Sequence, residues 1–206
     1  MRKGKSNNSG FSLVELIIVI AIMAILAAAI APAVIRYIQK ARASRATDEL
    51  RTIVTAVETG LVSSYAEEYE MDADKVFTDA AGRTYNCGVL TNWMLSRAQN
   101  DSTSEITDAN KLEYYFAEMV LIELNAEDGS DYRFFNFTGD EDDPLGFNCE
   151  SFSAQYKCPG VIVAYSTNGQ VVFAQYYNYG CLIEYTIGNG YYVVEDDEFV
   201  DAPRLQ

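Results

Sequence analysis

The chain has 206 residues, 49% of them hydrophobic, and 30 acidic against 15 basic side chains give a net charge of −15. This apolar content excludes a wholly disordered chain. Histidine is absent, which removes the commonest general base, the commonest metal ligand and every histidine-dependent nucleophile. We therefore expect a protein that is not an enzyme and that holds no cofactor or metal.

The negative charge is concentrated in the C-terminal part. From Thr52 onward 27 acidic residues face seven basic ones. Such a part repels phosphate backbones, so we expect no direct binding of nucleic acid by it. Solubility is the simple explanation of this charge, and cation binding is the alternative.

The N-terminus combines a short basic segment with a long apolar one. Residues 1–10 are basic and polar, and residues 11–35 are apolar, with sixteen uninterrupted apolar residues from Leu16 to Ala31. A helix of residues 11–35 would reach about 37 Å, enough to cross a bilayer core of about 30 Å.

Three interpretations of this segment compete. A secretory signal peptide would be cut near Ala29 or Ala33, and a plain membrane anchor would be kept. Glu15 argues against both, because an acidic side chain in an apolar segment costs a few kcal/mol (about 3 on insertion scales). The third interpretation is a prepilin signal.

The junction Gly10-Phe11-Ser12-Leu13-Val14-Glu15-Leu16 resembles that of type IV prepilins and pseudopilins, which carry a class III signal peptide. The resemblance covers about residues 4–55 and implies that prepilin peptidase cuts after Gly10 and methylates the new amino group of Phe11. The apolar helix is then kept, first as a membrane anchor and later as the filament core.

The resemblance also implies roles for two residues inside the apolar segment. Glu15 would pair with the positive amino terminus of a neighbouring subunit and set the axial register of assembly. The alternative is a glutamate that reaches the lipid headgroups. Pro32 lies where type IV pilins place a helix-bending proline, and it should kink or locally melt the helix. Simple tolerance of this proline is the alternative.

Basic residues are more numerous after the apolar segment than before it. Three precede it, and five follow it: Arg36, Lys40, Arg42, Arg45 and Arg51. Positive-inside counting would leave the acidic part in the cytoplasm. The resemblance implies the opposite, a single-pass membrane protein with its head outside the cell membrane, which later becomes part of an extracellular pilus.

The helix is expected to continue as an amphipathic segment over residues 36–62. One face collects its apolar residues at offsets of three, four and seven: Ala46, Leu50, Ile53, Val54, Val57 and Leu61. Arg42, Arg45 and Glu49 should lie away from this face. Gly60 or the pair Ser63-Ser64 is expected to end a helix of about fifty residues.

Residues 63–206 should form a globular acidic head. We expect helices at Thr91–Gln99 and at Asn110–Asn125, the latter capped by Asp108, and a short strand at Tyr132–Phe137. Four further strands should form two hairpins, around Asn168-Gly169 and around Gly188-Asn189-Gly190: Val161–Ser166, Gln170–Tyr177, Cys181–Ile187 and Tyr191–Val194. The fold class predicted is α+β and pilin-like, a long N-terminal helix packed on an antiparallel meander of three or four strands. Loop-like stretches are expected between Glu67 and Asn110, around the helix at Thr91–Gln99, and between Glu127 and Pro159.

Four cysteines in a head outside the membrane allow disulfides. The pairing we prefer is Cys149–Cys158 with Cys87–Cys181, and free thiols or a zinc site are the alternatives. Two acidic runs, residues 140–143 and 195–198, are read as solvated loops in preference to calcium sites.

The predicted protein is a structural subunit that forms a homopolymer, a type IV pilus serving adhesion, twitching motility or DNA uptake. Its partners would be prepilin peptidase, an assembly ATPase, an inner-membrane platform protein and, before assembly, the membrane. The alternatives are a pseudopilin of a type II secretion or competence system and a membrane-anchored binding protein that does not polymerise.

Overall fold

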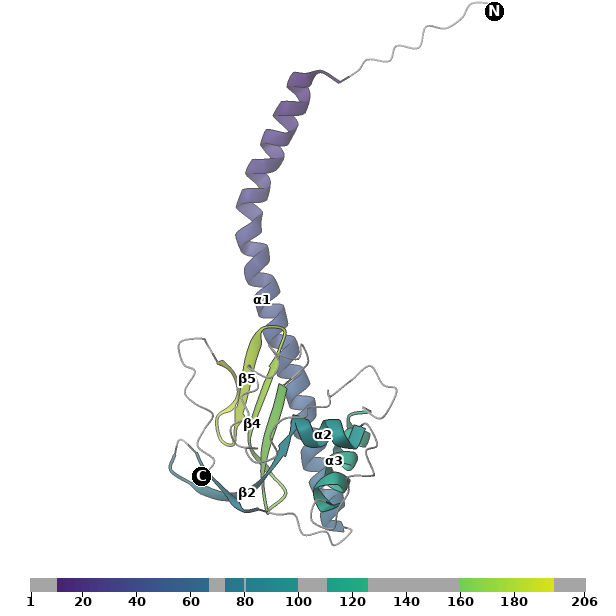
Figure 1. Cartoon of the computed structure of the whole chain (residues 1–206). Coiled ribbons are helices and arrows are strands. Elements are labelled where there is room, and N and C mark those ends of the chain that lie inside the picture. Colours follow the sequence, from purple (N-terminus) through teal and green to yellow (C-terminus); the bar gives the residue numbers. More distant parts are fainter. Residues whose placement is uncertain (1–10, 67–72, 80, 100–110, 126–159, 195–206) are drawn as a thin grey trace, which may run out of the picture. The chain divides into compact units, whose positions relative to one another are not determined.

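The computed structural model describes residues 11–66, 73–79, 81–99, 111–125 and 160–194 (Figure 1). It divides into two compact units, residues 1–41 and 42–206, and we call the second unit the head. Several predicted features lie outside the described residues: the leader residues 1–10, the cap Asp108, the strand Tyr132–Phe137, Cys149, Cys158 and both acidic runs.

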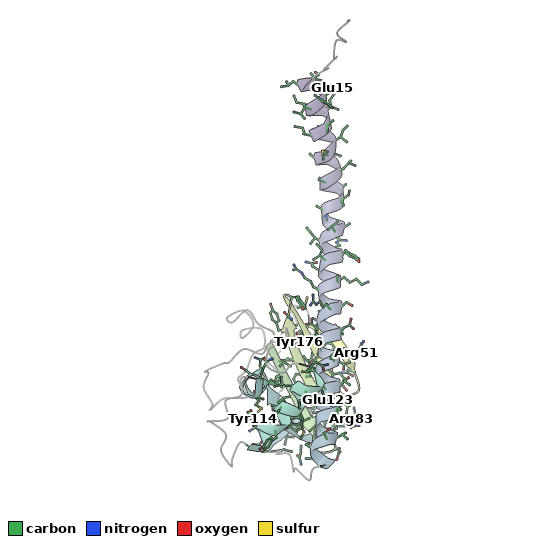
Figure 2. The ribbon with its side chains drawn as sticks, turned by 90° about the vertical axis from the view of Figure 1, so that its right-hand side faces the viewer. Glu15, Arg51, Arg83, Tyr114, Glu123 and Tyr176 are labelled. Atoms are coloured by element: carbon green, nitrogen blue, oxygen red, sulfur yellow. The ribbon has the colours of Figure 1, made fainter. Side chains whose placement is uncertain are left out.

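Helix α1, Leu13–Ala66, is a single helix of 54 residues that belongs to both units. Its N-terminal part, which is rich in alanine and large aliphatic residues, is exposed on all sides, and Figure 2 shows side chains projecting to both sides of the helix. Its C-terminal part buries one face, which includes Leu50, Ile53 and Val57 at 0% exposure. The amphipathic continuation is therefore confirmed.

Helix α1 passes the predicted stop at Gly60 and ends at Ala66, two residues after the alternative stop at Ser63-Ser64. Gly60 is buried against helix α3, where an added Cβ would lie 3.2 Å from a methyl carbon of Val120. Its missing side chain thus lets two helices approach closely. The Ser63 and Ser64 hydroxyls donate to the carbonyls of Thr59 and Leu61, so neither serine interrupts the helix.

The described part of the head contains one antiparallel sheet of six strands, which lie in the sheet in the same order as in the chain. The strands are β1 (Lys75–Thr78), β2 (Thr84–Thr91), β3 (Gly160–Ser166), β4 (Val171–Asn178), β5 (Cys181–Thr186) and β6 (Gly190–Val194). Strands β3 to β6 confirm the two predicted hairpins. The prediction that the stretch between Glu67 and the helix at Thr91–Gln99 is loop-like was wrong, because β1 and β2 lie there and add two strands to the meander.

Glycines with a positive φ close the predicted hairpins. In the β3–β4 connection Gly169 has φ 77°, and its N–H donates to the Ser166 carbonyl at 3.0 Å. In the β5–β6 connection Gly188 has φ 94°. These backbone conformations favour glycine, which explains why both turns could be recognised in the sequence.

Helices α2 (Asn92–Gln99) and α3 (Lys111–Glu123), both described between β2 and β3 in the chain, pack against each other (Figure 1). Both confirm predicted helices to within a few residues. Their buried side chains, among them Leu95, Phe116 and Val120, join the same core as the buried face of α1.

The sheet separates two apolar clusters. The larger cluster lies between the sheet and the helices, and it includes Leu50 of α1, Val163 of β3 and Tyr176 of β4. The smaller cluster consists of side chains on the opposite face, among them Phe77 and Phe173. Their rings stack with centroids 5.5 Å apart. A long helix packed on an antiparallel sheet confirms the predicted α+β class and is consistent with the pilin fold.

Candidate assembly site

The residues predicted to act in processing and assembly are Gly10 and Phe11, which precede α1 in the chain, and Glu15 in its first turn. Phe11 is 81% exposed, and Gly10 lies outside the described residues. A Glu15 carboxylate oxygen accepts a hydrogen bond from the Ser12 backbone N–H at 2.9 Å. A serine followed three residues later by such a glutamate has the spacing of a capping box, in which the carboxylate satisfies a free N–H at the helix start. Glu15 therefore has a partner within its own chain.

The segment that follows exposes large apolar side chains on every side. Their exposed fractions run from 43% at Ile38 to 75% at Leu13. Such a surface is unfavourable in water at about 25 cal/mol for each Å² of apolar area. Within the described part of the chain, this is the one helix long and apolar enough to cross a membrane, by length and composition.

Pro32 lies inside α1, and the helix continues through it. The local melting expected at this position is therefore absent from the single chain. Proline removes one backbone donor and disfavours a helix interior, yet α1 is helical on both sides of Pro32. Bending or melting at Pro32 in a filament stays a prediction.

In the head, the Glu49 side chain connects α1 to the sheet. Its carboxylate accepts hydrogen bonds from the hydroxyls of Tyr176 and Tyr179, each at 2.7 Å, and from the Asn178 amide at 3.2 Å. Arg45, one helical turn away, adds an ion pair at 3.1 Å. We call these five residues the Glu49 cluster. Its partners come from β4 and from the β4–β5 turn, so it sets the position of the helix along the sheet.

The hydrogen bonds change the titration of this carboxylate. Burial raises the pKa of Glu49, but the bonds that it accepts, the Tyr179 bond foremost among them, lower it by more. The pKa therefore lies below its ordinary value. The ionised form is the form that the folded head binds.

The β4–β5 turn places the Tyr179 side chain in this cluster. Tyr179 and Gly180 both have positive φ, 56° and 74°, as a two-residue turn of this type requires. A left-handed conformation costs a residue other than glycine about 1 kcal/mol. The Arg45 guanidinium lies 4.6 Å from the centre of the Tyr179 ring, and the ring hydroxyl is bound to Glu49. These contacts offset the backbone strain.

The placement of Glu49 corrects a prediction. The helical spacing predicts this residue away from the apolar face, yet its side chain is only 21% exposed and faces the sheet. Its spacing contained the signal, because Glu49 lies three residues after Ala46 and four before Ile53, on the flank of the apolar face. Arg42 and Arg45 are exposed, as expected.

The predicted Cys87–Cys181 disulfide is wrong, since both residues are free thiols. Cys87 lies in β2 and Cys181 in β5, and two strands separate them in the sheet. Three strand spacings amount to about 14 Å, whereas a disulfide needs α-carbons within about 7 Å. The side chains also join different apolar clusters. The pair Cys149–Cys158 lies outside the described residues.

Another buried carboxylate has a structural role. Asp79, whose side chain is 1% exposed, closes the β1–β2 connection by accepting bonds from the backbone N–H groups of Ala81 and Arg83 and from the Arg83 side chain at 2.6 Å. Among the described residues, no three acidic or cysteine side chains gather as a metal site would require.

Comparison with known families identifies the N-terminal segment. Residues 5–31 match the family model of the prokaryotic N-terminal methylation motif. The match confirms that this segment is a class III signal peptide of the type IV pilin and pseudopilin kind. No curated protein and no solved structure matches the chain.

The motif supports a type IV pilin-like or pseudopilin-like protein and indicates a structural subunit. A class III signal implies processing by prepilin peptidase and, in general, assembly into a filament. The apolar part of α1 supports anchoring in a membrane before assembly.

Proposed function

We propose that the chain is the structural subunit of a type IV pilus, cut after Gly10, methylated at Phe11 and polymerised into a surface filament through α1. One observation carries this proposal: a single helix, Leu13–Ala66, begins with a methylation motif, exposes an apolar segment on all sides and ends in the core of a folded head.

The exposed segment needs two successive environments. Lipid surrounds it while the prepilin is anchored, and the same segments of other copies surround it in the filament. In either environment the apolar side chains leave water, which is the favourable term for both states.

Glu15 sets the register as a subunit moves from lipid to filament. A carboxylate at this depth needs a partner. In the single chain that partner is the Ser12 N–H. Cleavage after Gly10 creates a positive amino group on Phe11, and the Glu15 carboxylate of a neighbouring subunit binds it. The assembly ATPase and the membrane platform protein drive the transfer, and the acidic head faces outward.

Electron microscopy of cells that produce the chain, labelled with an antibody to the head, tests this function. Long labelled surface fibres are expected, and their absence from cells that process the chain would contradict the proposal. Short labelled structures confined to the cell envelope would instead indicate a pseudopilin of a secretion or competence system.

Glu15→Val is the matching variant. It should be cut normally, as judged by gel mobility, and form no fibres, because the incoming amino group has no counter-charge. Ser12→Ala is the control, since it keeps both the carboxylate and the backbone N–H that binds it. A normal fibre yield from Glu15→Val would refute the register role.

A further inference from the structure

Three side chains with affinity for a membrane surface lie together just after the apolar segment. Arg36, Tyr37 and Lys40 are all exposed, Tyr37 at 75%. At about 100° per residue, they lie within an arc of about 100° on one side of α1. Arg36 and Lys40 are neighbours on that side, one turn apart.

The chain supplies no nearby negative charge for this pair. Residues 16–47 contain no aspartate or glutamate, so the nearest acid along α1 is Asp48, two turns beyond Lys40. Asp48 itself pairs with Arg51 at 3.5 Å. In the part of the chain that the structure describes, neither Arg36 nor Lys40 has an ion pair.

The length of the apolar segment puts these side chains at the depth of the lipid headgroups. Residues 11–35 reach about 37 Å as a helix, slightly more than a bilayer core of about 30 Å. Arg36 therefore lies at the boundary between the hydrocarbon core and the headgroup region. Tyrosine is enriched at this depth, and arginine and lysine there bind the phosphates of anionic lipids.

We propose that Arg36, Tyr37 and Lys40 bind anionic phospholipid headgroups of the leaflet on the head side, and that this contact holds the depth of α1 before assembly. The inference rests on the membrane-anchored stage of the proposed function. It also explains why basic residues stand on the side of the apolar segment where positive-inside counting disfavours them: they have a counter-charge in the leaflet.

The direct test measures which lipids surround the full-length chain. The chain is reconstituted into phosphatidylcholine vesicles that contain a minor fraction of phosphatidylglycerol. It is then extracted with a belt polymer that retains the adjacent lipid, and mass spectrometry compares the two lipids in the extract with those in the vesicle. We expect enrichment of phosphatidylglycerol around the natural chain at low salt. High salt should weaken it by screening.

The double variant Arg36→Gln/Lys40→Gln should lose this enrichment. The preference for phosphatidylglycerol should fall on the order of fivefold for each basic side chain removed. The variant Arg51→Gln/Lys75→Gln is the matched control, because it removes the same charge from the head, and it should behave like the natural chain. Equal enrichment in both double variants, or none in the natural chain, would overturn the proposal.

Two further readouts separate this proposal from its basis and from its rival. If alkaline carbonate removes the chain from the vesicles, the anchored stage of the proposed function is wrong. If the chain stays inserted but phosphatidylglycerol is not enriched around it, only the proposed headgroup contact is wrong. If Arg36→Gln/Lys40→Gln lowers filament yield but leaves lipid preference unchanged, the basic pair binds the acidic head of another copy, and the lipid proposal is wrong.

Discussion

The Tyr176 hydroxyl of β4 donates a hydrogen bond to the Glu49 carboxylate of α1 at 2.7 Å. The two residues are 127 positions apart in the chain, so this contact joins the helix to a hairpin formed much later in the sequence. In a filament subunit, force applied to the helix reaches the head through contacts of this kind. We therefore expect the Glu49 cluster to contribute to both the mechanical and the thermodynamic stability of the head.

Replacing Glu49 by glutamine should lower the free energy of unfolding by about 1–3 kcal/mol, because the hydrogen bonds lose their charged acceptor and the Arg45 ion pair is removed. Denaturant unfolding of the full chain in detergent, followed through the tyrosine signal of the head, measures this loss. Asp48→Asn is the control, since the neighbouring carboxylate is 69% exposed and its ion pair with Arg51 should contribute little. Equal losses in the two variants would contradict the assigned role of Glu49.

The contribution of Glu49 should depend on pH. Its pKa in the folded head is lower than in the unfolded chain, so the unfolded state binds the proton more tightly. The stabilisation is complete above the ordinary pKa of a glutamate, about 4.3, and is lost as the pH falls through the lower folded value. The stability difference between the natural chain and Glu49→Gln should accordingly be constant near neutral pH and shrink in acid. A stability difference that increased in acid would show that the pKa of Glu49 is raised in the folded head.

Asn92 should be a weak point of the head. It is fully buried at the start of α2, and within the described residues neither its amide nitrogen nor its amide oxygen has a hydrogen-bond partner. An unsatisfied buried polar group costs about 1–3 kcal/mol. Asn92→Leu, which is close in volume, should therefore raise the denaturant midpoint.

Thr91→Val provides the contrast for this variant. Thr91 is almost as buried, but its hydroxyl accepts a bond from the Met94 N–H at the start of α2. Removing that cap should lower the free energy of unfolding by about 1 kcal/mol and therefore lower the denaturant midpoint. A loss of stability in Asn92→Leu would show that the Asn92 amide is satisfied.

The hairpins of the head could be predicted because their signals are local. Asn168-Gly169 and Gly188 mark turns whose glycines adopt positive φ, and the adjacent runs rich in valine, isoleucine and tyrosine mark the strands. The two strands that were missed have no such signal. Lys75–Thr78 has only four residues, and Thr84–Thr91 includes Asn86 and Gly88, which disfavour strands. Their conformation comes from pairing with each other and with β3, which local sequence does not encode.

The candidate site divides in the same way. Phe11, Glu15 and the apolar segment were recognised because a short motif and a run of residues contain the whole signal. The Glu49 cluster was missed because its partners are brought together by the fold. The Cys87–Cys181 pairing failed for a related reason, since counting cysteines says nothing of which strands separate them.

The two described cysteines should differ in reactivity. Burial raises the pKa of the Cys87 thiol to about 11, and this side chain is fully buried, whereas Cys181 is partly exposed. Only the thiolate reacts with alkylating agents, so iodoacetamide should modify Cys181 well before Cys87 in the folded chain. Peptide mapping after a short pulse resolves the two sites. Faster labelling of Cys87, or a Cys87–Cys181 cross-link in the map, would contradict the sheet order described above.

The central claim is that the protein matures by cleavage after Gly10 and is kept as a membrane-inserted, assembly-competent helix. The intact mass of the mature protein, purified from cells that contain a prepilin peptidase, tests it most directly. The account predicts the mass of residues 11–206 plus one methyl group, with that group located on the amine of Phe11. A mature chain that begins after Ala29 or Ala33, or one that retains residues 1–10, would contradict it.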